Sequence, residues 1–418
     1  MPSTAVPLRA RRARAAVSAV FLVNAVLYAN VVPRLPEVKD RLDLSNAAFG
    51  AAIAAMPVGA LVSGLLAPVL IRRFGSAAVA SFGLVGLAAA VAAVPVAGSW
   101  AVLAAVFLVA GAVDAVVDVA QNAHGFRVQR LYGRSIVNAF HGLWSVGSVL
   151  GGLLGAAAAG LGVPLPVHIA VTSTVFAVVA VVAYRFLLPG PEDAERTADT
   201  AEPAATPVQG AVRRVAGRTV LMLAVLGVLA ACAAFVEDAG SSWGALYLRG
   251  EVGVGAAAAG LAFVSLQVAM TVGRLTGDRV VDRFGQRRVA RVGGVAIALG
   301  MGLALAVPSL ATTLVGFALA GLGVATLVPA VMHTADELPG LAPGTGLTVV
   351  SWLLRVGFLL SPTVVGLVAD ASSLRVALLG VVGAGVLTAV LGRVLVADGT
   401  PPDTSAPAPA GPASAPQP

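Results

Sequence analysis

Long apolar runs recur along the whole chain, and this feature constrains the fold more than any other. A helix that crosses a lipid bilayer needs roughly 20 mostly apolar residues, and runs of that length recur twelve times in the 418 residues. The spans predicted are residues 15–33, 47–71, 76–97, 100–124, 136–160, 163–184, 219–241, 253–273, 289–309, 311–333, 344–368 and 373–392. We therefore expect an all-α membrane protein with twelve transmembrane helices.

The composition excludes the soluble classes of protein. Of all residues 58% are hydrophobic and 11% are charged, whereas about a quarter of the residues of a soluble protein are charged. This is too little charge to cover a soluble enzyme or to keep a chain disordered. The net charge of +7 does not indicate nucleic-acid binding, because the arginines stand in short clusters between the apolar runs.

The basic residues indicate how the chain is oriented in the membrane. Most of the 27 lysines and arginines lie at the N-terminus, in the loops after even-numbered spans and in the segment after span 6. Loops rich in these residues stay in the cytoplasm, so we expect a multi-pass protein of the plasma membrane (cell inner membrane) with both termini cytoplasmic. The expected domains are a cytoplasmic N-terminus (1–14), a first six-helix half (15–189), a cytoplasmic linker (190–217), a second six-helix half (218–397) and a disordered cytoplasmic tail (398–418).

The two halves match each other at a constant offset of 210 residues. Gly111 matches Gly321, and residues 73–75 and 283–285 both read Arg-Phe-Gly. Unrelated matches in a glycine-rich chain would not share one offset, so we predict two parallel six-helix repeats. This organisation is typical of transporters whose two halves rock against each other.

The stretch from Gly273 to Arg288, GRLTGDRVVDRFGQRR, resembles the loop motif of the major facilitator superfamily. The resemblance implies the major facilitator fold, with a cytoplasmic latch in which Asp282 and Arg283 connect the halves and Gly285 permits a tight turn. The expected latch residues are Gly273, Arg274, Asp278, Asp282, Arg283, Gly285 and Arg287. The first-half copy has Arg72 where the motif has Asp, so we expect the latch on one side only.

The segment from Asp118 to Asn122, Asp-Val-Ala-Gln-Asn, is similar to an element of the fucose-permease-like branch of that superfamily. In that branch the acidic residue is implicated in proton coupling. The superfamily resemblance also implies that spans 1, 4, 7 and 10 line a central cavity. We therefore expect the polar residues of these spans to meet there.

Span 4 carries the residues that point most directly to ion coupling. Asp114 and Asp118 stand four residues apart and share a helix face, which Asn122 extends by one turn. Each Asp costs roughly 2.5–3.5 kcal/mol at mid-membrane unless it meets water, a partner or a proton. Both are therefore proton-coupling candidates. The alternative is a structural hydrogen-bonding pair that holds this helix to a neighbour.

Polar residues in other spans are candidates for the substrate cavity. The full set is Asn24, Tyr28, Asn122, Glu237, Asp238 and Arg355. Helix–helix hydrogen bonding is the alternative for Asn24 and Tyr28. A guanidinium in mid-span needs an anion, so we expect Arg355 to pair with an aspartate of span 4. Binding of an anionic substrate group is the alternative for Arg355.

Arg34 lies at the outer end of span 1 and is the outer gate candidate. We expect it to pair with Glu237 or Asp238 when the outer side is closed. The alternative is that these two acids simply lie in the outer interface without an arginine partner.

Together these features predict secondary active transport of a small molecule by alternating access, coupled to protons. The alternative to import of a sugar-like solute is a proton antiporter that exports drugs or metabolites; a second alternative is a non-transporting sensor on a transporter scaffold. We expect no enzyme activity, cofactor or metal site, since the sequence shows no P-loop and no catalytic triad arrangement. The expected partners are the lipid bilayer, a small-molecule substrate and protons, with no nucleic acid, and the protein is expected to be a monomer.

Overall fold

The computed structural model describes residues 7–132, 136–190, 192, 217–338, 341 and 345–395. Within these ranges every regular element is helical, and twelve helical segments are long and apolar enough to cross a membrane. The predicted fold class and number of spans are therefore confirmed. Most of the predicted linker (190–217) and all of the predicted tail (398–418) lie outside the described residues.

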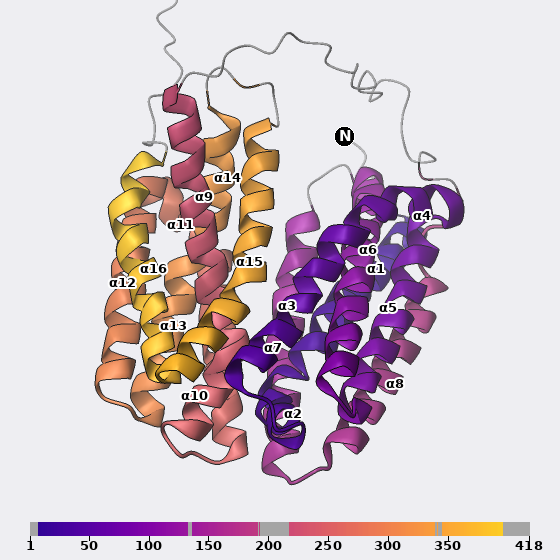
Figure 1. The fold of residues 1–418 in the computed structure, drawn as a ribbon. Helices are drawn as coiled ribbons and strands as arrows, with labels where there is room; N and C mark the ends of the chain where they lie inside the picture. The colour runs from indigo at the N-terminus through magenta and orange to yellow at the C-terminus, as the bar shows by residue number, and fades with distance from the viewer. Residues whose placement is uncertain are drawn as a thin grey trace, which may run out of the picture.

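The helices form two groups along the chain, coloured indigo to magenta and rose to yellow in Figure 1. The first group comprises α1 (Leu8–Ala29), α2 (Leu35–Arg41), α3 (Asn46–Ser63), α4 (Ala67–Phe74), α5 (Ser76–Ala93), α6 (Trp100–Tyr132), α7 (Val137–Gly160) and α8 (Leu165–Tyr184). The second comprises α9 (Gly217–Asp238), α10 (Gly244–Gly250), α11 (Ala256–Phe284), α12 (Gln286–Ala306), α13 (Leu310–Val324), α14 (Leu327–Asp336), α15 (Thr345–Ala371) and α16 (Leu374–Leu391).

Several helices run further than the predicted spans. Span 8 was expected to end at residue 273, but α11 continues to Phe284, and α6 likewise passes the expected end at residue 124 to reach Tyr132. Hydropathy marks only the part of a helix that crosses lipid, whereas arginine and other polar residues continue a helix readily. The chain turns at Gly285, which has a φ of 89°, a backbone angle that glycine adopts without strain and other residues rarely adopt. Most of the expected latch loop is therefore helix.

The repeat seen in the sequence recurs in the packing of the helices. A Cβ atom on Gly111 of α6 would collide with the backbone oxygen of Met56 on α3. A Cβ atom on Gly321 of α13 would collide with the backbone oxygen of Leu266 on α11. Both residues of the second contact stand 210 positions after those of the first. Glycine thus allows the same close helix approach in each half.

The two halves meet mainly where α3 packs against α15 and α7 packs against α11, and α2 also contacts α10. At one end of the molecule the Asp370 carboxylate of α15 accepts hydrogen bonds from the backbone N–H groups of Asn46 and Ala47 on α3, both at 2.8 Å. An ion pair between Arg249 and Asp40, at 3.1 Å, joins the halves at the same end. We name this end, at the bottom of Figure 1, the clamped end.

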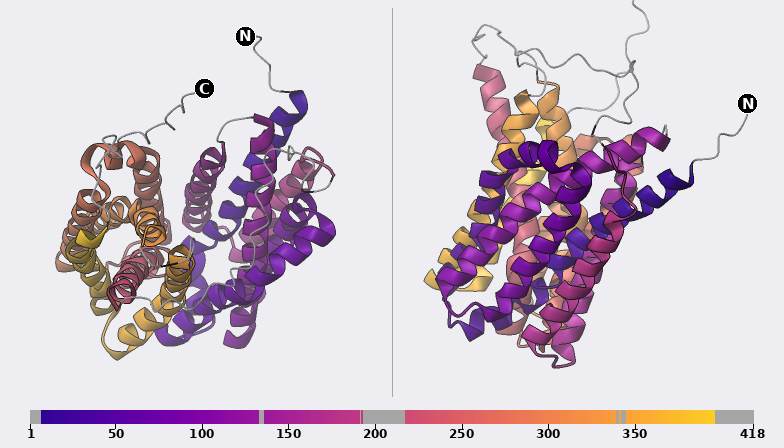
Figure 2. Two further views of the ribbon diagram at one scale, coloured as in Figure 1. Left: turned by 90° about the horizontal axis from the view of Figure 1, so that it is seen from above. Right: turned by 90° about the vertical axis from the view of Figure 1, so that its right-hand side faces the viewer.

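The start of α9 lies at the other end, which we name the linker end (Figure 1). Towards this end the ribbons of the two halves diverge (Figure 1), although Gly142 of α7 still lies beside Leu275 of α11. Seen from above, the helices of the two halves lie side by side and meet in the middle (Figure 2, left). The structure is thus joined at one end of the bundle and spread at the other.

Candidate functional site

Three helices of the first half meet at a buried amide, that of Asn24, which is only 4% exposed. The Asn24 Nδ2 atom of α1 donates to Oδ1 of Asp114 on α6 at 2.7 Å. The Trp144 Nε1 atom of α7 donates to Oδ1 of Asn24 at 2.9 Å. We name Asn24, Asp114 and Trp144 the Asp114 cluster. The Asn24 amide donates through its nitrogen and accepts through its oxygen. Hydrogen bonds therefore connect the Asp114 carboxylate to α1 and, through Asn24, to α7.

A second cluster lies one helical turn further along α6. Asn122 Nδ2 donates to the Asp118 carboxylate at 3.2 Å and to the Asp118 backbone oxygen at 2.8 Å. Gln121 Nε2 lies 3.3 Å from the same carboxylate, and His141 Nε2 of α7 lies 3.2 Å from Asn122 Oδ1. We name these four residues the Asp118 cluster. Asp118 and His141 are both exposed, whereas Asp114 is half-buried.

The second half has its own buried carboxylate, Asp238 at the end of α9. Its two oxygens accept hydrogen bonds from Ser242 Oγ at 2.6 Å and from Ser361 Oγ of α15 at 2.7 Å. A π-helical turn, Ala239–Trp243, directly follows Asp238, and such turns are frequent at functional sites. The sequence did not indicate either serine as a site residue, because serine is common in apolar helices and its position does not show what it hydrogen-bonds to.

Glu237 lies beside this carboxylate but contacts a different helix. Its side chain is 3.8 Å from the guanidinium of Arg274 on α11. Arg274 was expected in the cytoplasmic latch, yet it lies within α11 and pairs inside its own half. The motif resemblance predicts a loop at this position, but α11 continues through most of the motif.

Tyr28 is the candidate that contacts residues of both halves. It is half-buried in α1 and packs against a small cluster that contains Phe263 of α11, in the other half. Tyr28 thus lies where α1 packs against the second half.

The expected outer gate pair does not form, although the halves meet at the clamped end. Arg34 is buried and contacts the Glu37 carboxylate at 2.6 Å, with the Val163 backbone oxygen at 3.0 Å and His168 Nδ1 at 3.4 Å. Glu37, three residues away on the same helical turn, satisfies the guanidinium locally. The prediction that Arg34 pairs with Glu237 or Asp238 is therefore wrong for this closed arrangement.

Arg355 also lacks the partner that we expected for it. It is exposed, and among the described residues it forms no ion pair with Asp114, Asp118 or any other acid. The predicted ion pair between Arg355 and span 4 is therefore absent from this structure.

The remaining latch residues do not connect the halves in this structure. Asp278, Asp282 and Arg283 are exposed, and the Arg283 guanidinium lies 5.6 Å from the ring centre of its neighbour Phe284. Arg287 donates to the backbone oxygen of Leu395, at 3.0 and 3.2 Å. Gly273 packs closely against Ala325 within the second half. These residues lie at the linker end, where the halves diverge.

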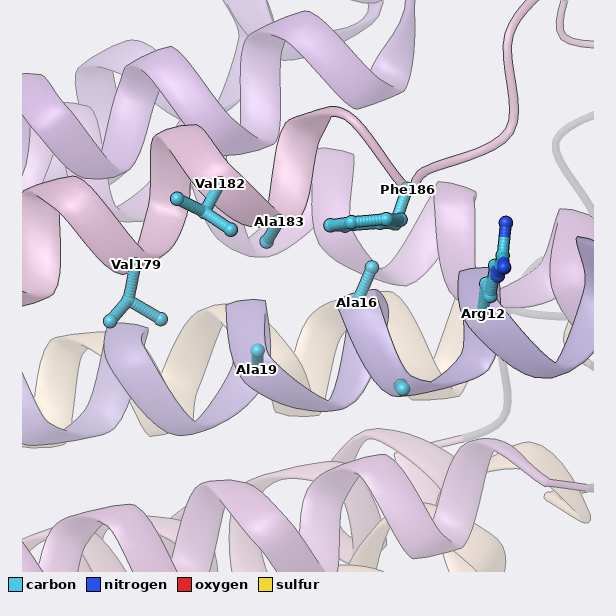
Figure 3. A pocket seen from close by; sticks show the side chains of 8 residues that line it. Arg12, Ala16, Ala19, Val179, Val182, Ala183 and Phe186 are labelled. Carbon is cyan, nitrogen blue, oxygen red and sulfur yellow. The ribbon is translucent and has the colours of Figure 1, made fainter.

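A surface pocket of about 320 Å³ lies between α1 and α8, away from both clusters. Figure 3 shows that Ala16 and Ala19 of α1 face Val179, Val182 and Phe186 across it. Arg12 supplies the charged side chain of its lining. None of the predicted site residues lines this pocket, so the polar clusters remain the candidate site.

The profile of the Major Facilitator Superfamily matches residues 17–248 and 226–417, which is nearly the whole chain. The chain belongs to the major facilitator superfamily. It is therefore a multi-pass membrane transporter of this type, and the superfamily resemblance of the loop motif is confirmed. The narrower assignment to the fucose-permease-like branch stays a prediction.

Three curated relatives match over most of their length. An uncharacterized transporter of Sinorhizobium fredii is 29% identical over 379 residues, which is 91% of this chain and 97% of that protein. The membrane protein MosC of Rhizobium meliloti is 29% identical over 90% of this chain and 88% of its own. An uncharacterized MFS-type transporter of Yersinia pestis is 27% identical over 85% of this chain and 89% of its own.

Solved structures of transporters share the fold at low sequence identity. The nucleoside transporter NupG has a TM-score of 0.71 at 14% identity, over 91% of this chain and 98% of that chain. A bacterial homolog of the lysosomal transporter Spinster, in an inward-facing and unoccupied conformation, has a TM-score of 0.73 at 16% identity, over 94% and 98% of the two chains. A D-xylose-proton symporter has 0.68 at 13% identity, over 91% and 95%. At these identities the likeness concerns the fold alone.

Proposed function

We propose that this transporter moves a small polar molecule by alternating access and couples that movement to protons through Asp114. The observation that carries the proposal is the Asp114 cluster, in which one carboxylate is hydrogen-bonded to α1 and, through Asn24, to α7. A proton on Asp114 weakens its charge-assisted bond to Asn24. Protonation would therefore alter the contact between three helices of the first half.

Asp118 takes a different role in this proposal, although it shares the helix face with Asp114. It is exposed beside Asn122 and His141 and is free to meet a solute. The two carboxylates stand one helical turn apart, and like charges at that spacing repel. A solute group that donates to Asp118 therefore changes how readily Asp114 holds a proton, which links solute binding to proton binding.

The direction of opening follows from the basic residues. Arginine-rich segments such as 9–14 and 283–288 are at the linker end, and by the positive-inside rule we place this end in the cytoplasm of a cell whose plasma membrane holds the protein. The structure then corresponds to a state closed on the outer side. The lipid bilayer, protons and a small solute are its partners, and it acts as a monomer.

The test is proton movement in proteoliposomes that contain a pH-sensitive dye, with sugars, organic acids and amphipathic drugs supplied outside. Wild type should give a solute-dependent pH change with at least one class. Asp114→Asn should lose the pH change by at least tenfold while still binding the solute, whereas Asp118→Asn should weaken solute binding. Unchanged proton movement in Asp114→Asn would contradict the proposal.

The same measurement separates import from export. A solute that enters together with protons acidifies the lumen, whereas a solute exchanged for protons makes it more alkaline. The sign of the pH change decides between these two forms of the proposal.

A further inference from the structure

Arg355 is a charged residue in the middle of α15, with ten residues of the helix before it and sixteen after it. We propose that Arg355 binds the anionic group, a carboxylate or a phosphate, of the transported solute. This inference rests on the proposed function only in taking the solute to bind between the two halves. It does not depend on proton coupling.

The face of α15 that carries Arg355 is fixed by contacts elsewhere on the helix. At about 100° per residue, Pro362 and Gly366 lie within about 20° of Arg355 around the helix axis. Both of these residues pack against the backbone of α3 in the other half, at Gly50 and Asn46. Arg355 therefore faces the first half, about 10 Å further towards the linker end than Pro362.

The opposite face of α15 confirms this orientation. Leu353 packs against Gly227 of α9, and Gly357 packs against Ala231 of α9, within the second half. Their positions are roughly 160–200° away from Arg355 around the helix. Arg355 thus points out of its own half, and its side chain is exposed.

Three acidic groups of the candidate site already have partners of their own. Asp114 accepts from Asn24, Glu237 pairs with Arg274, and Asp238 accepts from two serines. In the described part of the chain Arg355 has neither an ion pair nor a side-chain hydrogen bond with any acid. An uncompensated guanidinium at mid-membrane is costly, so its retention there is best explained by an anion that arrives with the solute.

The chemistry of the side chain defines the class of solute. A guanidinium presents a planar fork of N–H donors that matches a carboxylate or a phosphate in two parallel hydrogen bonds. The Asp118 cluster on the first half offers carboxylate and amide oxygens that accept from hydroxyl or amino groups. We therefore assign the solute to small hydroxylated or amino-substituted organic anions.

The experiment measures binding by the thermal stability of the full-length protein in detergent, where no proton gradient exists. The probes are acetate, inorganic phosphate, glucuronate, glucose 6-phosphate and neutral glucose, each at constant ionic strength. At least one anionic probe should raise the Tm of wild type in a saturable way, and glucose should not. In Arg355→Gln the apparent Kd of that probe should rise at least tenfold, because the charged hydrogen bonds are lost.

Two further variants keep the result interpretable. Arg355→Lys retains the charge but not the fork, so it should bind more weakly than wild type and more tightly than Arg355→Gln. Arg291→Gln, at an exposed arginine of α12 that contacts the Ala389 backbone oxygen, should bind as wild type does. The apparent Kd of glucuronate, compared with that of glucose 6-phosphate, shows whether the site prefers a carboxylate or a phosphate.

Three outcomes would overturn the inference: no anionic probe stabilises wild type, Arg355→Gln binds as tightly as wild type, or Arg355→Gln weakens glucose and the anions equally. The last outcome would assign Arg355 to gating between the halves. Failure of the proton-coupling proposal is distinguishable, because it leaves anion binding in detergent intact while Asp114→Asn still moves protons.

Discussion

At the scale of single residues, two aspartates of one helix face differ because their neighbours differ. Asp114 is held by Asn24, which Trp144 holds in turn, whereas Asp118 is exposed and contacts residues of its own helix. In the sequence the two aspartates look alike, since both are acidic residues on one face of the same apolar span. The structure therefore gives them different surroundings, through side chains on α1 and α7.

Replacing Asn24 tests the Asp114 cluster directly. Asn24→Ala should lower stability by about 1–3 kcal/mol, because it leaves a carboxylate and the Trp144 indole N–H without their partner. It should also reduce the solute-driven pH change in proteoliposomes by tenfold or more. Thermal denaturation in detergent and the dye measurement report the two effects separately.

Asn30→Ala is the matched control for this variant. Asn30 lies directly after α1, is buried like Asn24, and donates to Thr172 of α8 at 2.7 Å. Its loss should lower stability by a similar amount and leave the pH change per solute intact. If both variants lose proton movement equally, the Asp114 cluster has no special part in coupling.

At the scale of helices, the clamped end is held by a carboxylate at a helix N-terminus. Asp370 accepts from the first two N–H groups of α3, where the helix dipole also favours a negative charge. The ion pair between Arg249 and Asp40 at the same end is exposed on both sides, and such pairs contribute little. We infer that Asp370 is the main polar contact that favours closure of this end.

Neutralising Asp370 should therefore favour opening of the clamped end. Asp370→Asn loses the charge and one acceptor, so the equilibrium should shift towards the open side by about fivefold, as expected for about 1 kcal/mol. The readout is the labelling rate of a cysteine introduced at Ala47. Asp43→Asn removes the charge of an exposed carboxyl between α2 and α3 that forms no ion pair among the described residues, so it should leave the rate unchanged. Equal rates in all three proteins would contradict this role.

Helix packing within each half depends on glycine at the repeated positions. Gly111→Ala would drive a methyl group into the backbone of Met56 and should cost about 1–3 kcal/mol through overpacking. Gly302→Ala, in α12, should not destabilise the protein, because a Cβ atom at Gly302 would meet no other atom within 4 Å. Thermal stability in detergent measures both, and a Gly111→Ala protein as stable as wild type would refute the close contact.

At the scale of the whole molecule, the sequence was sufficient to predict twelve spans and their arrangement in two repeats. The apolar runs reflect the need of every span to match the lipid, and the repeated glycines reflect close helix packing in each half. Both signals can be read directly from the sequence. Helix ends were predicted less well, because charged residues such as Arg274 and Asp278 continue α11 beyond the lipid-crossing part. The pattern could not distinguish a charged helical extension from a loop.

Partners of polar side chains depend on contacts across the molecule. Asn24 and Asp114 were each candidates as polar residues in apolar runs, but no sequence pattern links positions 90 residues apart. Arg34 was assigned to a distant acid, although Glu37 on its own helical turn satisfies it. The contact of Asp370 with α3 involves backbone N–H groups, which carry no sequence signal at all.

We propose that the two ends of the molecule open in turn and that Asp114 couples this exchange to protons. Distances between spin labels test it most directly, with one pair at the linker end, Arg73→Cys with Arg283→Cys, and another at the clamped end, Leu161→Cys with Val307→Cys, all in a Cys232→Ala background. When pH is lowered or solute is added, the first distance should shorten as the second lengthens, and Asp114→Asn should abolish the response to pH. Distances that stay fixed, or that respond to pH equally in Asp114→Asn, would contradict the account.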